Sequence, residues 1–480
     1  MIRNPVLTML LVLALPGLAA PAAKELPASM TLEPDKTIRI YDTFLLGVND
    51  SWPDLSGIRA VAGSPQLPGP EIAGRLRSPL LRMNGFDSQY LDWKKLPGRG
   101  LPGRLAAIRQ WNPEAQYIWT VNMARGTPED ARSLAEFLTG DSDTLWGRVR
   151  IDLGFPEPMP PAIWELGDEL DYNYSRFHSG AAYASECLRY IFAIRSVIPD
   201  ARFAVHAVTA PWADRSKGKL PEFNRTLLDA LAEEIDFLSF HPYLRDLPPA
   251  VAEPYFENLA REIAASRNPE IRLLVTEPAL PPQGIAGKSP EHQLRSVSLA
   301  GCLEEAEWFL FLLSRPEVGA ATLFQLPPGV RGMTGMTANG LPFETGLAQL
   351  YRFISRIPSG SRMVRSTLSG EAAVFNRSRT LSAAALKSPD GNKLYVLFDN
   401  QSPETDRPVS FRILRDRQWI LENALRLSAP ELASRNTATE RPIAETSLPV
   451  SPGKPPEQLT IPAKSLVLVI LTRPTKEESK

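Results

Sequence analysis

The stretch Ile163-Trp164-Glu165-Leu166-Gly167-Asp168-Glu169 is a short, largely apolar run that ends in a glycine and two carboxylates. Such a run is typical of a buried strand in a parallel sheet whose carboxyl end opens on a site. The run Leu273-Leu274-Val275-Thr276-Glu277-Pro278 has the same form. Glu169 and Glu277 are 108 residues apart. This separation is too long for one supersecondary unit and fits three βα units of a barrel.

Similar apolar runs recur along the first two thirds of the chain, and segments with helical character separate them. We predict strands at 39–48, 79–84, 116–122, 162–167, 201–206, 237–241, 271–277 and 320–326. A helix is predicted to begin at Pro128, with Thr127 as its N-cap. Eight strands that alternate with helices indicate an α/β fold of the (β/α)8 TIM barrel type over residues 36–355. A doubly wound open sheet is disfavoured because no glycine-rich fingerprint follows the first strand.

The pattern changes after residue 355. Strand-like runs at 381–387, 394–399, 409–414 and 466–472 are joined by turn signals such as Pro389-Asp390-Gly391-Asn392. No long amphipathic segment separates these runs. We therefore predict a C-terminal antiparallel β-sandwich domain over residues 356–474.

Composition restricts the class of protein. The chain has 480 residues, of which 43% are hydrophobic and 22% charged, and its formal net charge is −1. Without a charge excess, neither nucleic acid nor an anionic membrane is expected as the main partner. The two cysteines, Cys187 and Cys302, are expected to be buried free thiols. The four histidines show no metal-ligand spacing, so neither a metal nor another cofactor is expected.

The first residues have the form of an export signal. Arg3 precedes an apolar run over residues 6–18, and small residues follow it up to Ala23. The run is shorter than the roughly 20 residues that span a bilayer, which favours a cleaved signal peptide over a membrane anchor. We expect residues 1–22 to be removed and the protein to be periplasmic or secreted, with no integral membrane segment after cleavage.

The carboxyl ends of barrel strands converge on one mouth, so residues there can meet although they are distant in sequence. Two carboxyl groups in such a mouth can act as the proton donor and the nucleophile of a retaining glycosidase. Single residues also have structural interpretations: Arg82 could pair with a carboxylate for stability, Asn122 could bond loop backbone, and Trp212 could pack in its loop rather than stack on a sugar ring. The candidate site residues are Arg82, Asn84, Asn122, Asp168, Glu169, Trp212, His241, Tyr243, Glu277 and Gln325.

Several motifs resemble those of a known family. Trp164-Glu165-Leu166-Gly167-Asp168-Glu169 is similar to the acid/base motif of clan A glycoside hydrolases, and Val275-Thr276-Glu277 to their nucleophile motif. The resemblance is greatest to α-L-arabinofuranosidases, and it continues through Leu81-Arg82-Met83-Asn84-Gly85, His241-Pro242-Tyr243 and Ile461-Pro462-Ala463-Lys464-Ser465.

The resemblance implies a role for each matched residue. Glu169 would be the general acid/base, Glu277 the nucleophile, Tyr243 a hydroxyl that orients Glu277, and Arg82 a cation that keeps Glu277 ionised. The family carries Asn before its acid/base, where this chain has Asp168. The resemblance also implies that residues 29–35 add a strand to the sandwich.

The sequence therefore predicts an exported, cofactor-independent retaining glycoside hydrolase of the α-L-arabinofuranosidase type, acting on an oligo- or polysaccharide. Two alternatives remain open. The first is another clan A activity, such as a β-xylosidase or a heparanase-like β-glucuronidase. The second is a non-catalytic glycan-binding protein on the same scaffold. The sugar, its linkage and the oligomeric state are left open.

Overall fold

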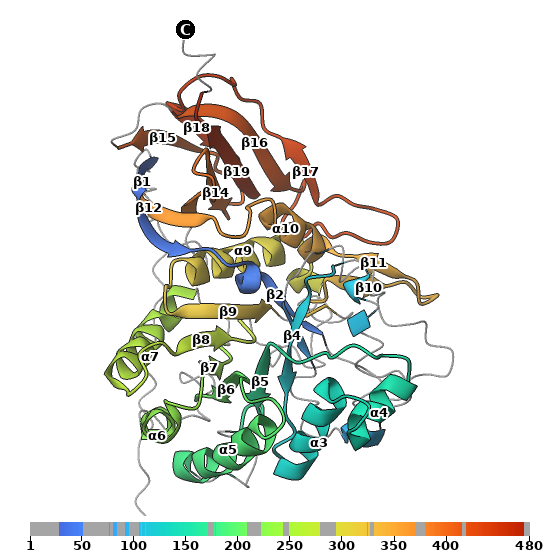
Figure 1. Ribbon diagram of the computed structural model, residues 1–480. Coiled ribbons are helices and arrows are strands. Elements are labelled where there is room, and N and C mark those ends of the chain that lie inside the picture. The colour runs from blue at the N-terminus through green and yellow to red at the C-terminus, as the bar shows by residue number, and fades with distance from the viewer. Residues whose placement is uncertain are drawn as a thin grey trace, which may run out of the picture.

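The computed structural model describes residues 28–50, 76, 80–83, 92–95, 105–106, 108–110, 112–170, 177, 179–208, 222–242, 249–278, 294–323, 325–326, 331–370, 380–414 and 419–474 (Figure 1). The expected signal segment 1–22 and the candidate site residues Asn84, Trp212 and Tyr243 lie outside these ranges. Within them, no helix has the length and apolar character needed to span a bilayer.

Eight parallel strands close into a barrel, as predicted from the spacing of the apolar runs. In order around the barrel they are β2 (Gly47–Asp50), β3 (Leu80–Met83), β4 (Gln116–Thr120), β5 (Ile163–Leu166), β6 (Phe203–His206), β7 (Phe237–Phe240), β8 (Arg272–Val275) and β9 (Val318–Leu323). The (β/α)8 prediction is thus confirmed.

Helices surround the barrel (Figure 1). The longer ones are α3 (Pro128–Thr139), α4 (Leu145–Asp152), α5 (Gly180–Arg195), α6 (Glu222–Leu231), α7 (Glu253–Ala265), α9 (Leu299–Leu313) and α10 (Gly346–Ile354). Short 3-10 turns are η1 (Thr43–Leu46), η3 (Trp93–Lys95) and η5 (Pro249–Ala252), and β10 (Thr334–Met336) pairs with β11 (Pro342–Glu344). Helix α3 begins as predicted, with Thr127 and Asp130 forming a capping box.

The barrel begins later than predicted. The strand expected at 39–48 is divided: β1 (Ala28–Ile40) belongs to the other sheet, and the barrel starts with β2 after η1. The division has a local cause, because the side chain of Asp42 accepts a 2.9 Å hydrogen bond from the backbone N–H of Phe44 and caps η1. Residues 36–40, expected in the barrel domain, therefore lie in β1.

The second domain is a curled nine-stranded sheet in which β1, blue in Figure 1, lies among the C-terminal strands. Its order is β17-β16-β19-β14-β13-β12-β1-β15-β18. Among the described strands all neighbouring pairs are antiparallel except β1 and β15, which are parallel. The C-terminal strands are β12 (Arg362–Ser369), β13 (Leu381–Lys387), β14 (Lys393–Asn400), β15 (Arg407–Ile413), β16 (Ile420–Ser428), β17 (Ala444–Ser447), β18 (Gln458–Ile461) and β19 (Ser465–Thr472).

The central strands of this sheet are apolar on both faces. In β14, Leu394, Val396 and Phe398 lie in the sandwich's own core, whereas Tyr395 and Leu397 pack into the core cluster that continues into the barrel. Because strand side chains alternate between faces, a strand that is buried on both faces requires a nearly continuous apolar run. The sheet is thereby joined to the barrel through buried apolar contacts.

The inside of the barrel is built in two layers. Seven strands each contribute one buried apolar residue to a lower layer: Leu80, Ile118, Ile163, Ala204, Phe237, Leu274 and Ala320. Two residues further along each strand, nearer its carboxyl end, is a buried polar or charged side chain: Arg82, Thr120, Glu165, His206, Ser239, Thr276 and Thr322. The strand period of two places these side chains inside the barrel above the apolar layer. The candidate site rests on this polar layer.

Helix α9 lies between the barrel and the second sheet and carries a buried carboxyl group (Figure 1). Glu305 is 5% exposed, and Arg331 Nη1 lies 3.3 Å from its Oε1. Burial outweighs the attraction of Arg331 and raises the pKa of Glu305 to about 7. The neutral form is therefore favoured in the folded protein.

Glu305 should make folding depend on pH. Its folded pKa lies above the unfolded value of 4.5, so its contribution is fully present below that value and is lost as pH rises through about 7. The loss amounts to at most roughly 3 kcal/mol. We expect the free energy of unfolding, measured in urea, to fall less between pH 5 and pH 8 in Glu305→Gln than in the wild type. Glu304→Gln, on the same helix in a surface ion pair with Arg295, is the control, and an equal effect of both variants would contradict the assignment.

Candidate active site

One arginine holds the polar layer together. Arg82, at the end of β3, is fully buried and donates from Nε to Glu165 Oε2 at 2.6 Å and from Nη1 to Glu277 Oε1 at 2.8 Å. Its Nη2 donates to Asp168 Oδ1, and Nη1 also reaches Asn49 Oδ1 at 3.1 Å. Three carboxylates, two from the end of β5 and one from the end of β8, thus share a single guanidinium, which the parallel closure of the barrel brings within their reach.

Charge and burial oppose each other in this cluster. Burial disfavours the charge of Arg82, but Glu165, Asp168 and Glu277 outweigh it and raise the pKa of the guanidinium. Burial likewise favours neutral Glu165, yet Arg82 outweighs burial and lowers the pKa of that carboxyl. Glu277 differs: burial, reinforced by the charges of Asp168 and Glu169, raises its pKa well above the usual range despite Arg82. Arg82 acts on Glu277 in the direction that the resemblance implies, because it lowers the pKa of this carboxyl group against the effect of burial.

Glu169 is held in an unusual backbone conformation. Its φ is 48°, in the left-handed region that residues with a Cβ rarely adopt. The turn before it depends on Gly167, whose φ is 83° and where an added Cβ would collide with Leu170. The turn directs Glu169 back to the mouth, where its side chain is only 13% exposed. Strain of this kind is common at functional sites, where the surrounding structure maintains it.

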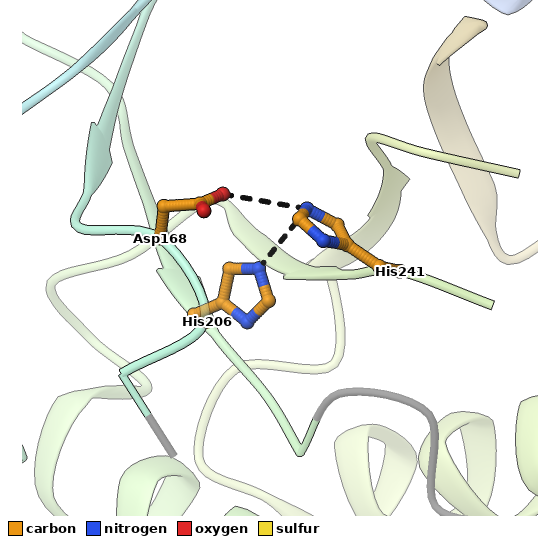
Figure 2. Close-up of side chains that lie close together, drawn as sticks. All are labelled: Asp168, His206 and His241. Carbon is orange, nitrogen blue, oxygen red and sulfur yellow. Dashed lines mark hydrogen bonds and ion pairs between the residues drawn. The ribbon is translucent and has the colours of Figure 1, made fainter. Parts of the chain in front are cut away.

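His241 links the two glutamates. Its Nδ1 lies 2.9 Å from Glu169 Oε1, and its Nε2 lies 3.7 Å from Glu277 Oε1. On the Nε2 side the ring also faces Asp168 Oδ1 at 3.5 Å and His206 Nε2 at 3.4 Å (Figure 2). Burial lowers the pKa of His241 well below its usual range, so the ring is neutral. The two glutamates therefore contact opposite nitrogens of one neutral imidazole.

Five candidate residues are brought together, namely Arg82, Asp168, Glu169, His241 and Glu277. Asn122 instead lines a cavity of about 380 Å³ beside α3, and its Oδ1 accepts from the N–H groups of Arg125 and Gly126. Gln325 lies in a turn after β9, where its backbone bonds to Arg331 and Met333. The structural interpretation of Asn122, bonding of loop backbone, thus has direct support.

Four residues of the cluster were not among the candidates: Asn49, Thr120, Glu165 and His206. Thr120 Oγ1 donates to Glu165 Oε2 at 2.8 Å, and Asn49 Nδ2 donates to the carbonyl of Thr276 at 2.7 Å. The signal that could have identified them is a polar residue two positions after an apolar one within a buried strand. Thr120 and Glu165 lie within predicted strands, where a polar side chain gives no local sign of the layer that it forms.

A metal could be held at one point of the cluster, although the histidine spacing gave no reason to expect it. Within the described ranges, ligand atoms of Asp168, His206 and His241 lie within 4.8 Å of one another, and all three residues are buried.

The strain at Glu169 can be measured as stability. Asn adopts the left-handed region more readily than other residues with a Cβ, for which it costs roughly 1–2 kcal/mol. We expect Glu169→Asn to be more stable than Glu169→Gln by about 1 kcal/mol in urea unfolding. Both variants remove the charge, so their difference reports the backbone. Equal stabilities would contradict the strained conformation.

Comparison with known proteins was made in sequence and in structure. No family model matches the sequence. The chain is 26% identical over 145 residues to an intracellular exo-α-(1→5)-L-arabinofuranosidase from Streptomyces lividans. That alignment covers 30% of this chain and 21% of the enzyme, so the similar sequence is a minor part of both.

The structure is similar to solved arabinofuranosidases. An α-L-arabinofuranosidase from Thermotoga maritima, solved in complex with arabinose, matches with a TM-score of 0.76 and 17% identity, covering 93% of this chain and 100% of the other. A family 51 arabinofuranosidase from Xanthomonas axonopodis pv. citri matches with a TM-score of 0.76 and 16% identity over the same shares. The chain therefore has the barrel-and-sandwich fold of α-L-arabinofuranosidases over nearly its whole length and is similar to one of them in sequence over 30% of it.

Proposed function

We propose that the protein is an exported retaining glycoside hydrolase with α-L-arabinofuranosidase-like activity on an oligo- or polysaccharide. The observation that carries the proposal is the pair Glu169 and Glu277, set on opposite nitrogens of His241 at the barrel mouth. Export rests on the signal-like sequence of residues 1–22. The activity of the proteins with this fold supports the choice of sugar.

Hydrogen bonding supports Glu169 as the proton donor. His206 Nδ1 contacts the carbonyl of Ala207 at 3.0 Å, and a carbonyl can only accept, so Nδ1 of His206 carries a proton. In the tautomer with a single proton, on Nδ1, His206 Nε2 accepts from His241 Nε2, which leaves Nδ1 of neutral His241 as an acceptor. The proton in the 2.9 Å contact between this Nδ1 and Oε1 of Glu169 must come from the carboxyl group.

The reaction follows from these positions. Glu169 gives its proton to the leaving oxygen while Glu277 attacks the anomeric carbon and forms a glycosyl-enzyme. Glu169, now a carboxylate, takes a proton from the water that releases the sugar. Arg82 stays hydrogen-bonded to Glu277 Oε1 in the free enzyme and orients it for attack. The strained turn at Glu169 keeps its carboxyl group near the same carbon.

Experiment can distinguish the alternative functions of the site. A β-xylosidase or a heparanase-like β-glucuronidase would use the same pair on another sugar, and a glycan-binding protein would bind without cleaving. Screening aryl α-L-arabinofuranosides, β-xylosides and β-glucuronides distinguishes them. Chromophore release from the arabinofuranoside alone is the expected result, and release from none of the three would exclude the proposed enzyme.

Substitution of each glutamate should have a different result. Glu277→Ala removes the nucleophile, and we expect activity to fall by at least about 10⁴-fold on all substrates. Glu169→Ala should retain glycosylation by aryl glycosides whose leaving group needs no proton, and azide should accelerate turnover. The measurement is aryl-glycoside release with and without azide, with product stereochemistry followed by NMR. Azide rescue of Glu277→Ala with retention would reverse the assignment.

The raised pKa of Glu277 predicts the pH profile. A nucleophile must be ionised, so kcat/KM should rise with pH through the raised pKa of Glu277. Asp168→Asn removes a negative charge that raises this pKa, and we expect the acidic limb to move to lower pH. An unchanged limb, or one that moves to higher pH, would show that Asp168 does not control the ionisation of Glu277.

A further inference from the structure

Two histidines outside the usual chemistry of a two-glutamate site are oriented in the manner of metal ligands. Nδ1 of His206 contacts the carbonyl of Ala207 at 3.0 Å, and Nδ1 of His241 contacts Glu169 Oε1 at 2.9 Å. Their Nε2 atoms face each other at 3.4 Å (Figure 2). Metal-binding imidazoles use one nitrogen for the ion and hydrogen-bond a carbonyl or carboxylate with the other. Both rings therefore have outer partners of the right kind in place.

Asp168 supplies a third ligand from the opposite side. Its carboxylate is 1% exposed and is turned toward the two Nε2 atoms in Figure 2. Oδ1 accepts from Arg82 and lies 3.5 Å from His241 Nε2. Oδ2 is buried and has no hydrogen-bond partner among the residues that the structure describes. A buried carboxylate oxygen without a partner is costly, and a bound cation would satisfy it.

The spacing of these atoms suits Zn²⁺. Tetrahedral Zn²⁺ binds nitrogen and oxygen at about 2.0–2.1 Å, which sets neighbouring ligand atoms roughly 3.3 Å apart. The separations here are 3.4 Å between the two Nε2 atoms and 3.5 Å between His241 Nε2 and Asp168 Oδ1. Two imidazoles and one carboxylate are a ligand set that Zn²⁺ accepts, with a fourth position open to water.

The charge of the surroundings favours a cation. The carboxylates of Glu165, Asp168 and Glu277 all pair with the one guanidinium of Arg82. All three carboxylates and Arg82 are buried. One guanidinium thus serves three buried carboxyl groups, and Oδ2 of Asp168 has no partner among the described residues. A divalent ion beside Asp168 would bind this oxygen and add positive charge to the cluster.

We propose that Asp168, His206 and His241 bind one Zn²⁺ ion. The ion would bind Nε2 of His241, which lies 3.7 Å from Glu277 Oε1. An ion at this position would hinder the attack of Glu277 on a sugar. Zn²⁺ would thus inhibit the proposed hydrolysis reversibly. The inhibitory consequence rests on the proposed function, whereas Zn²⁺ binding itself does not.

Binding is measured on the full chain after treatment with EDTA and dialysis. Zn²⁺ is titrated in competition with a chromogenic chelator, and bound metal is counted by mass spectrometry. We expect one Zn²⁺ per chain and a rise in thermal midpoint on binding. His206→Ala and Asp168→Asn should each weaken binding by at least about 10-fold. Co²⁺ should give visible absorption bands in the wild-type protein.

A matched control separates the site from a general effect of replacing a buried carboxyl group. Asp399→Asn makes the same change at a fully buried carboxyl in the sandwich, whose pKa burial raises well above the usual range. This variant should bind Zn²⁺ as the wild type does. Circular dichroism checks that each variant is folded.

The outcomes decide the two proposals separately. Absence of stoichiometric Zn²⁺ binding to the folded wild-type protein would overturn the metal site, whatever its activity on glycosides. Binding equally strong in folded His206→Ala and Asp168→Asn would also overturn it. Zn²⁺ binding that both variants weaken, in a protein that cleaves no aryl glycoside, would support the metal site and reject only the proposed hydrolase.

Discussion

The pairing of three buried carboxylates with the single guanidinium of Arg82 is the interaction on which the rest of the site depends. Arg82 lies in β3, Glu165 and Asp168 at the end of β5, and Glu277 at the end of β8, so the contacts form only when the barrel closes. Removing the guanidinium would leave uncompensated buried charges, which is far more costly than loss of a surface ion pair. Burial, reinforced by the charges of Asp168 and Glu169, raises the pKa of Glu277 in spite of Arg82.

The barrel supports this charge cluster through its layered interior. The apolar residues below, such as Leu80 and Ile163, are buried and pack together under the site. Glu165 and Arg82 then lie on rigid strands rather than on loops, two residues above that layer. Glu169 follows β5 through a strained turn that the packing around Gly167 maintains.

The second domain acts as a support for one side of the barrel. Its central strands β14 and β19 are apolar on both faces, and α9 lies between them and β9. Strand β1 joins this sheet before the chain enters the barrel, so the two domains are connected at both ends of the barrel sequence. The buried carboxyl of Glu305 lies in the same helix, which makes the packing of α9 sensitive to pH.

The sequence by itself determined the class of fold and the position of the catalytic candidates. Apolar runs of strand length at regular spacing require burial on both faces, and glutamates at the ends of two such runs can meet only at a barrel mouth. Only the tertiary structure decided which residues contact one another. In the folded protein β1 pairs within the second sheet, and His206 contacts His241. These outcomes depend on residues far apart in the chain that meet only when eight strands close, and on burial, which no local pattern reports.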